Sequence, residues 1–226
     1  MIEKVLEKEK NIVFDADSHK YYIHDIEHQS VTKLIKNYFP FDRQEISLEV
    51  AQRSGISQKE VLANWNDIME NGSYVHDLID KHLRGVKISE DAFEKIKPVI
   101  DYLDIFDDFK VLASEVKIYS SKYKLAGTID LIALIDGKLF LIDWKTNSKK
   151  IDKNISFEKA LSPFDEFWNN NYYAYSLQLS LYSVILKEEY DIEVYDFFIV
   201  HIQGDTCTRV NVLDLRFEAL ELLQSL

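Results

Sequence analysis

The spacing of hydrophobic and polar residues predicts the elements of this 226-residue chain. Between residues 44 and 109 the apolar positions recur about every 3.6 residues, which predicts helices, with breaks at Gly55, at residues 85–89 and at Pro98. A second helical pattern covers residues 172–189. Shorter helices are expected near 31–37 and from 213 onward. Runs rich in β-branched and aromatic residues predict strands at 11–14, 20–24, 114–119, 125–135, 138–145, 194–202 and 206–212.

The order of these elements predicts an α/β fold, with a central mixed β-sheet flanked by helices and a helical N-terminal portion. We expect a single domain over residues 1–226. Residues 1–110 would form its hairpin and helical portion, and residues 111–226 its sheet core. No internal repeat, low-complexity tract or Gly/Ser linker marks a firm boundary.

One expected hairpin carries a specific geometric prediction. Asp136-Gly137 separates two strand patterns and is the kind of dipeptide that closes a two-residue type I′ turn. Counting outward from this turn places Asp130 opposite Asp143. Because side chains alternate along a strand, Lys145 projects from the same face as both aspartates.

Two facing carboxylates resist ionising together unless a cation lies between them. Mg²⁺ or Mn²⁺ would relieve the conflict, and a lysine beside the ion can hold a hydrolytic water or stabilise charge on a phosphate. The alternative is a solvated strand pair in which Lys145 neutralises both acids. Apolar neighbours argue against solvation and predict burial of both faces, with Ile129, Leu131, Ala133, Phe140, Ile142 and Trp144 on one and Ile132, Leu134, Leu139 and Leu141 on the other.

Composition narrows the classes of function. A net charge of −12 argues against a protein coated in basic residues for tight, nonspecific duplex binding. The single cysteine, Cys207, excludes an internal disulfide and any four-cysteine zinc or iron-sulfur site within this chain. No apolar run approaches the roughly 20 residues that span a bilayer, so we expect a cytoplasmic protein without membrane association. Lysines do gather on both flanks of the hairpin, although ordinary solvated lysines explain them equally well: Lys117, Lys122, Lys124, Lys145, Lys149, Lys150 and Lys153.

Two further residues are candidates for the metal site. His76 lies in a helical pattern with Gly72 one turn earlier and Asp80 one turn later, so the helix could approach closely while Asp80 orients the imidazole. Glu115 begins a strand and could supply a third carboxylate. Each has a commoner explanation, since helical histidines are mostly surface or satisfied core residues and strand-end glutamates are mostly exposed.

The helix predicted at 172–189 carries polar and aromatic candidates. Gln178 and Tyr182 stand at i and i+4 and could jointly contact a nucleotide or brace the sheet, with Tyr175 on the adjacent turn. Packing is the commoner role of such a helix. A zinc site is disfavoured for three N-terminal histidines whose spacing does not give one converging ligand set: His19, His24 and His28.

Taken in order, the segments GSYVHD, SEV, GTID, IDWKT and YSLQLSLY resemble the PD-(D/E)XK nuclease superfamily, specifically the RecB-like branch that includes phage exonucleases and CRISPR-associated relatives. The resemblance runs from about residue 70 to 185. It implies a restriction-endonuclease-like core, with Lys145 positioning or activating the attacking water and Gln178 and Tyr182 contacting substrate. It also implies one or two divalent metals held by His76, Glu115, Asp130, Asp143 and the Trp144 carbonyl.

The chain departs from the family pattern in two ways. Gly-Thr-Ile-Asp stands where the family name suggests Pro-Asp, a variation that the RecB-like branch tolerates. The cysteines that hold an iron-sulfur cluster in some CRISPR-associated relatives are absent, so no such cluster is expected.

The resemblance implies a metal-dependent deoxyribonuclease, an exonuclease or flap-type enzyme that acts on free or single-stranded DNA ends in recombination, repair or phage replication. Lys149 and Lys150 would join Gln178 and Tyr182 in substrate binding. A helicase, a recombinase or a second copy of the chain could supply further grip on DNA. The alternatives are a noncatalytic nucleic-acid or protein-binding module that retains the fold, and a hydrolase of small phosphorylated substrates, which no Gly-rich phosphate loop supports.

Overall fold

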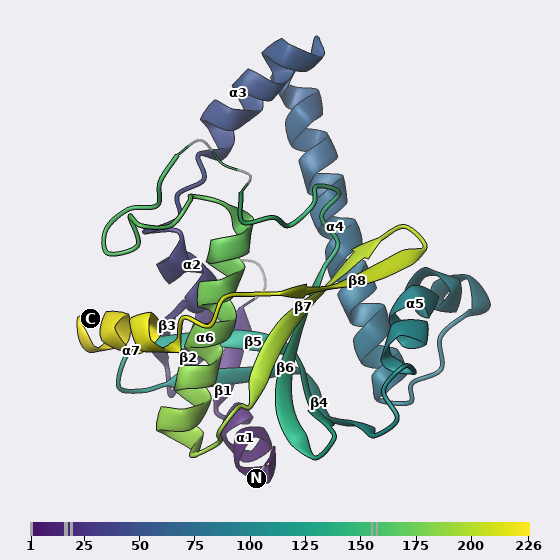
Figure 1. The fold of residues 1–226 in the computed structure, drawn as a ribbon, viewed down its shortest axis with the longest axis vertical. Coiled ribbons are helices and arrows are strands. Elements are labelled where there is room, and N and C mark those ends of the chain that lie inside the picture. Colours follow the sequence, from purple (N-terminus) through teal and green to yellow (C-terminus); the bar gives the residue numbers. More distant parts are fainter. Residues whose placement is uncertain (1, 16–17, 19, 155, 157) are drawn as a thin grey trace.

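The computed structural model describes residues 2–15, 18, 20–154, 156 and 158–226. Helices cover both faces of a twisted sheet, and α3 and the first half of α4 project away from it (Figure 1). The elements are α1 (Ile2–Glu9), β1 (Ile12–Asp15), β2 (Lys20–Ile23), β3 (Ile26–Ser30), α2 (Val31–Ile35), α3 (Arg43–Ser54), α4 (Gln58–Leu83), α5 (Glu90–Leu103), β4 (Phe109–Ser120), β5 (Leu125–Ile135), β6 (Lys138–Lys145), α6 (Asn171–Tyr190), β7 (Asp196–Gln203), β8 (Thr206–Asn211) and α7 (Arg216–Gln224).

The described residues form one eight-stranded sheet. Its order is β1-β2-β3-β5-β6-β7-β8, and β4 pairs with the other edge of β5. The β3–β5 and β6–β7 pairs are parallel and the remaining pairs antiparallel, so the sheet is mixed. This confirms the predicted α/β class, with a mixed sheet flanked by helices.

The predicted β5–β6 hairpin is present with its expected turn. Asp136 has φ 51° and Gly137 φ 70°, and a type I′ turn needs positive φ at both central residues. Pairing runs from Ile135 opposite Lys138 to Leu131 opposite Ile142, which is the predicted register.

Local signals also explain how the helices begin and end. Ser57 and Glu60 form a capping box at the start of α4, and Asn170 caps α6 by accepting a hydrogen bond from an amide of the first turn. Gly55, at φ 71°, ends α3 as predicted. The break predicted at Pro98 is wrong, because this residue lies inside α5. Packing of the helix against the sheet outweighs the backbone hydrogen bond that proline cannot donate.

Two elements were absent from the prediction. Strand β3 was missed because its sequence, IEHQS, contains few β-favouring residues. It follows β2 through a tight turn at His24 and Asp25, both of which have positive φ. Helix α1 lies in the charged, amphipathic first ten residues and buries Val5.

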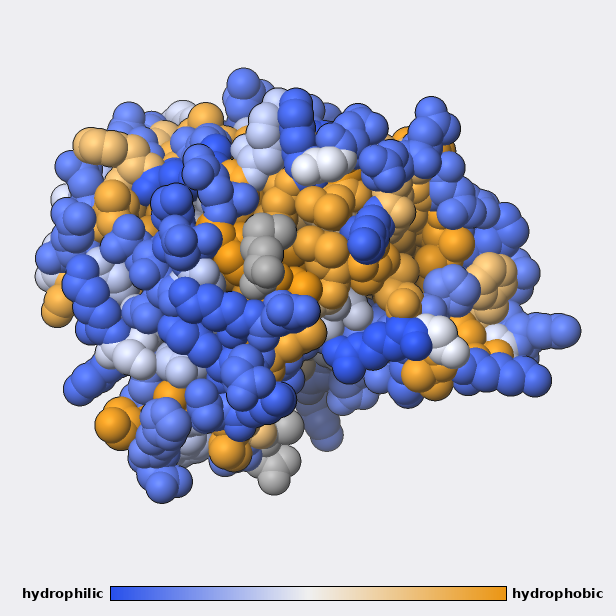
Figure 2. Space-filling view, turned by 90° about the horizontal axis from the view of Figure 1, so that it is seen from below, coloured by the Kyte–Doolittle hydropathy of each residue, from blue (hydrophilic) through white to orange (hydrophobic). Residues whose placement is uncertain are grey.

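Hydrophobic clusters lie on both faces of the sheet. One contains buried residues of α1, α2, α6 and α7, and the other those of α4 and α5. Leu139 and Leu141 join the first cluster, and Phe140 and Ile142 the second, which confirms burial on both sides. Seen from below, hydrophilic side chains cover much of the surface while hydrophobic ones gather in one region (Figure 2). Within the described ranges, no helix has the length and hydropathy needed to cross a membrane.

One facing prediction is wrong. Ile129 was expected on the same face as Leu131, but it packs in the first cluster whereas Leu131 packs in the second. The alternation fails between them because the β4–β5 pairing skips Glu115 and Asp130, and Glu115 adopts φ 48°. The irregularity therefore falls on two of the candidate metal ligands.

Candidate metal centre

The site lies where two strands diverge along one edge of β5. Strand β3 pairs with Leu125 and Ala126 at the start of β5, and β6 pairs with residues 131–135 at its end. Residues 127–130 lie between these two neighbours, in what we call the split in the sheet. The Asp130 carboxylate accepts a hydrogen bond from the Trp144 amide at 2.8 Å, one position beyond the last hairpin pair. Gly127 and Thr128 line a cavity of about 730 Å³ that opens at this split.

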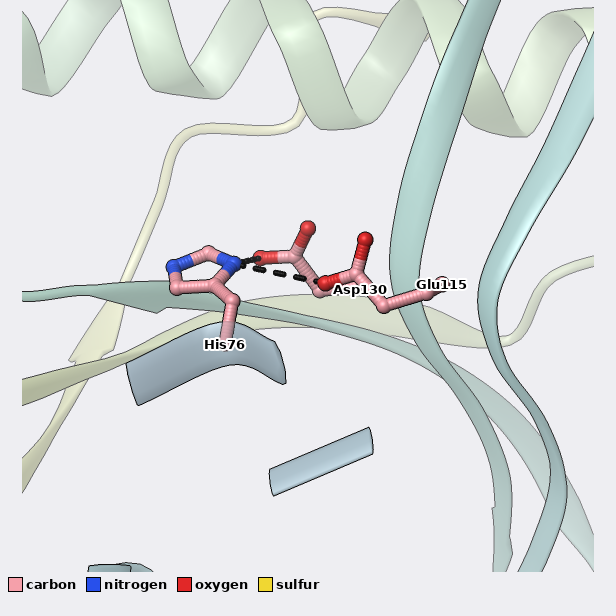
Figure 3. A group of neighbouring side chains, drawn as sticks. All are labelled: His76, Glu115 and Asp130. Atoms are coloured by element: carbon pink, nitrogen blue, oxygen red, sulfur yellow. Dashed lines mark ion pairs between the residues drawn. The ribbon is translucent and has the colours of Figure 1, made fainter. Parts of the chain in front are cut away.

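Three side chains from separate elements converge beside the split. His76 of α4 places Nδ1 3.4 Å from Glu115 Oε1 and 3.5 Å from Asp130 Oδ2. Both carboxylates point toward the same ring nitrogen (Figure 3). One potential ligand atom from each residue lies within 4.8 Å of the others, which is close enough for a single ion to contact all three.

Burial and mutual attraction shift the pKa values of this cluster. Burial lowers the pKa of His76, but the charges of Asp130 and Glu115 outweigh burial and raise it to about 9. Burial raises the pKa of Asp130, against the opposing charges of His76 and Lys145. The imidazolium thus supplies positive charge to two otherwise repelling carboxylates.

Asp143 and Lys145 form a second group beside the same cavity, which Lys145 lines. Lys145 Nζ lies 2.5 Å from Asp143 Oδ2, as expected for side chains two residues apart on one strand face. Burial raises the pKa of Asp143 to about 6, against the effect of Lys145. Burial lowers the pKa of Lys145, but Asp143 and Asp130 outweigh it and raise the pKa above its usual value. The Tyr175 ring contacts the same ammonium group, with its centroid 4.6 Å from Nζ.

Gln178 and Tyr182 lie behind this pair on α6. Gln178 Nε2 donates to the Tyr182 hydroxyl at 3.3 Å and approaches Asp143 Oδ1 at 3.5 Å. The Tyr182 ring packs against Gly127, where an added Cβ would lie 2.6 Å from its Cε1. Tyr182 is only 3% exposed, yet both it and Gln178 line the cavity, so contact with a nucleotide and bracing of the sheet both stay predictions.

Helix α4 approaches the end of β6 closely, as expected from its glycine. A Cβ on Gly72 would lie 2.7 Å from Thr146 Oγ1. The expected pairing of Asp80 with His76 is wrong. Asp80 instead accepts hydrogen bonds from Arg84 Nε at 2.7 Å and from the Ser114 hydroxyl. One turn beyond His76, the Asp80 carboxylate is directed toward strand β4, where it ties α4 to the strand that carries Glu115.

The basic flanks contribute less than expected to the cavity wall. Lys149 and Lys150 are exposed and do not line the cavity, and Lys150 pairs with Asp152 at 3.0 Å. Lys117 lies 3.6 Å from Glu9. The predicted roles of Lys149 and Lys150 in substrate binding remain untested.

Two other sequence predictions concern Trp144 and the three N-terminal histidines. Trp144 is buried in the second cluster and also lines the cavity, and the role of its carbonyl as a ligand remains a prediction. Of the three histidines considered for zinc, His19 lies outside the described residues. His28 Nδ1 lies 2.9 Å from the carbonyl oxygen of Ile26.

The sequence did not reveal the opposite wall of the cavity. Tyr21 lies over the split, where its hydroxyl is 3.1 Å from Thr128 Oγ1. Ser30 and Thr32 line the same wall. These residues reach the site through the two-residue parallel pairing of β3 with β5, which no local pattern indicates.

The converging donors fit a divalent cation. The set combines one imidazole nitrogen with carboxylate oxygens, ligands that suit Mn²⁺ and, for the oxygens, Mg²⁺. A bound cation would take the place of the proton that His76 carries between the two carboxylates, because only neutral imidazole binds a metal. Glu115 Oε1 is buried and accepts no hydrogen bond from any described residue. Its one positive neighbour among the described residues is His76 Nδ1 at 3.4 Å, and a cation would add a direct contact to this oxygen.

Comparison with known proteins identifies a family. A family model described as the PD-(D/E)XK nuclease superfamily matches residues 28–213. No functionally curated protein matches the chain.

Two solved structures show weaker likeness. A candidate exonuclease from Eubacterium rectale is 14% identical with a TM-score of 0.40, over 68% of this chain and 64% of that protein, so this chain spans less than two thirds of its length. A protein named SSO0001 is 16% identical with a TM-score of 0.39, over 99% of this chain and 82% of that protein.

Proposed function

Because the chain belongs to the PD-(D/E)XK nuclease superfamily, we propose that it is a metal-dependent nuclease that hydrolyses phosphodiester bonds of DNA. The observation that best supports this proposal is the convergence of His76, Glu115 and Asp130 beside a cavity lined by His76, Glu115 and Lys145, with Asp143 paired to Lys145. The proposed ligands and Lys145 thus lie together where β3 and β6 diverge along β5, and the adjoining cavity would provide room for a substrate.

We assign the divalent cation, Mg²⁺ or Mn²⁺, to His76, Glu115 and Asp130. One or two bound ions would neutralise phosphate charge and lower the pKa of a coordinated water. Asp143 forms an ion pair with Lys145 in the structure. To act as the predicted metal ligand as well, Asp143 would bind the ion through one carboxylate oxygen and remain paired with Lys145 through the other. Trp144 would add its carbonyl oxygen.

Lys145 would orient the attacking water. Its ammonium group is held between the Asp143 carboxylate and the Tyr175 ring, and the charges of Asp143 and Asp130 keep it protonated. A protonated lysine donates hydrogen bonds, so it would orient the water and stabilise negative charge developing on the phosphate. The bond from water oxygen to phosphorus would form as the bond to the leaving oxygen breaks, without a covalent enzyme intermediate. The attacking water would release a proton to solvent, and the leaving oxygen would take up a proton from solvent.

Gln178 and Tyr182 would keep this geometry fixed. Gln178 Nε2 approaches Asp143 Oδ1, and Tyr182 limits where the Gln178 amide can lie. We also propose that Gln178, which lines the cavity, contacts substrate.

The finer features of the proposal follow the family resemblance. We propose an exonuclease or flap-type activity of the RecB-like kind on free or single-stranded DNA ends, in recombination, repair or phage replication. A helicase, a recombinase or a second copy of the chain would assist binding, because the net charge of −12 limits the affinity of one chain for DNA. A cytoplasmic location and a single domain over residues 1–226 belong to the same proposal.

A cleavage assay tests this function. End-labelled single-stranded DNA, duplex DNA and RNA would be incubated with the protein in Mg²⁺, Mn²⁺ or EDTA. We expect metal-dependent cleavage of DNA, fastest on single-stranded ends, with a ladder of products that reveals polarity. Binding of these nucleic acids without cleavage in either metal would instead identify a noncatalytic module.

A further inference from the structure

A second cavity adjoins the proposed catalytic one. It has a volume of about 340 Å³ and lies between β2, β3 and α2. Ser30 and Thr32 line both cavities, so they form a shared ridge between them. The Ser30 hydroxyl caps α2 by accepting a hydrogen bond from the Lys33 amide at 3.1 Å, which fixes the ridge in place. A polymer bound in the first cavity could therefore continue into the second.

The second cavity carries positive charge that the fold leaves available. Lys33 and Lys36 are exposed, lie three residues apart at α2, and line the cavity. Neither has an ion-pair partner in the part of the chain that the structure describes. The nearby acid, Glu27, is already paired with Lys20 at 2.8 Å. In a chain with a net charge of −12, two unpaired lysines at one cavity favour an anionic ligand.

A buried histidine supplies an independent observation. His28 lines the same cavity, is 4% exposed, and places Nδ1 2.9 Å from the Ile26 carbonyl oxygen. Because a carbonyl oxygen can only accept, Nδ1 carries the proton of that hydrogen bond. Nε2 is buried and has no hydrogen-bond partner among the described residues. With the proton on Nδ1, Nε2 is an acceptor that needs a donor, and an ordered water could donate to it while also donating to a phosphate oxygen in the cavity.

We propose that the second cavity binds a backbone phosphate of the substrate strand whose scissile phosphate occupies the first cavity. The strand would cross the ridge of Ser30 and Thr32, and Lys33 and Lys36 would bind the phosphate. This inference rests on the proposed nuclease function and adds to it a path for the strand. Such contacts would hold a single strand in register without reading its bases.

The salt dependence of binding tests this path. In a Lys145→Ala background, which stops cleavage, the Kd for a labelled single-stranded oligonucleotide would be measured across a range of salt concentrations with and without Lys33→Ala/Lys36→Ala. Each neutralised phosphate contributes about 0.7 to the slope of log K against log salt for single strands, so loss of this one phosphate site should lower the slope by about 0.7 and weaken binding at about 0.1 M salt about 5-fold. Each single substitution should produce about half the change in slope.

A matched pair of lysines provides the control. Lys4 and Lys110 are exposed and line neither cavity, so Lys4→Ala/Lys110→Ala should leave the slope unchanged. Equal slopes for the two double variants would overturn the phosphate site, even if the wild-type protein cleaves DNA. A wild-type protein that neither binds nor cleaves any nucleic acid would contradict the proposed function, and this inference with it. Thermal melts would establish that every variant is folded.

Discussion

Gly127→Ala is expected to destabilise the protein by forcing Tyr182 out of place. The new Cβ would lie 2.6 Å from Tyr182 Cε1, 2.8 Å from its hydroxyl oxygen and 3.0 Å from Cζ. Carbon atoms pack best at roughly 3.5–4.0 Å, so the ring must move by about 1 Å. Tyr182 is 3% exposed and surrounded by packed side chains, which leaves little room for that movement.

The magnitude follows from two opposing effects. Overpacking a buried site typically destabilises by about 1–3 kcal/mol. Replacing glycine with alanine restricts the unfolded chain and returns about 0.4–1 kcal/mol. We therefore expect a net loss of about 1–2 kcal/mol in the free energy of unfolding, which corresponds to a fall in Tm of roughly 2–8 °C for a chain of this size. Activity should fall too, because Tyr182 limits the position of Gln178 beside Asp143.

Urea denaturation of a double-mutant cycle would measure this effect. The cycle combines Gly127→Ala with Tyr182→Leu, which removes all three clashing atoms. The alanine should destabilise the wild-type background but not the leucine background, and the coupling energy should exceed about 1 kcal/mol. An equal loss in both backgrounds, or none in either, would refute the claim that Gly127 exists to admit the Tyr182 ring.

Three other perturbations test separate parts of the account. Gly72→Ala should leave the free energy of unfolding unchanged or higher. The new Cβ would meet only the rotatable Thr146 hydroxyl, and alanine favours the helix by about 1 kcal/mol over glycine. A loss of more than about 1 kcal/mol in urea denaturation would contradict this. Mn²⁺ at about 100 times its Kd should stabilise the folded protein by about 2.7 kcal/mol and raise Tm by roughly 5–10 °C in a melt that EDTA reverses, whereas an unchanged Tm would argue against a metal site. Burial raises the pKa of Cys207 to about 11. At pH 8, iodoacetamide should therefore label it roughly 100-fold more slowly than a solvent-exposed cysteine. The rate should rise about tenfold per pH unit up to pH 10 as the thiolate forms. Labelling at the rate of a free cysteine would show that the thiol is not held in that environment.

Much of the fold could be predicted because its signals are local. Asp136-Gly137 fixed both the turn and the register of β5 with β6, and the helical period of residues 172–189 located α6 to within one residue at each end. Long-range pairing had no such signal. Strand β3 joins β5 through only two residue pairs, so neither the split in the sheet nor the wall formed by Tyr21 could be foreseen.

Part of the candidate site could also be predicted from local signals, and part could not. The shared face of Asp143 and Lys145 follows from strand alternation alone. The position of Glu115 depends on a left-handed backbone conformation at a residue other than glycine, which sequence does not indicate. The residues alone made His76 and Glu115 weak candidates, the family resemblance implied them as ligands, and the structure brings them together with Asp130.

The central claim is that Asp130 holds the metal that cleavage requires, whereas Lys145 serves cleavage without holding the metal. Titrating Mn²⁺ into Asp130→Asn and Lys145→Ala proteins, with cleavage of single-stranded DNA measured in parallel, tests it most directly. The account predicts that Asp130→Asn loses both metal binding and cleavage, while Lys145→Ala keeps metal binding and loses cleavage. Undiminished metal binding by Asp130→Asn, or cleavage at the wild-type rate by Lys145→Ala, would contradict it.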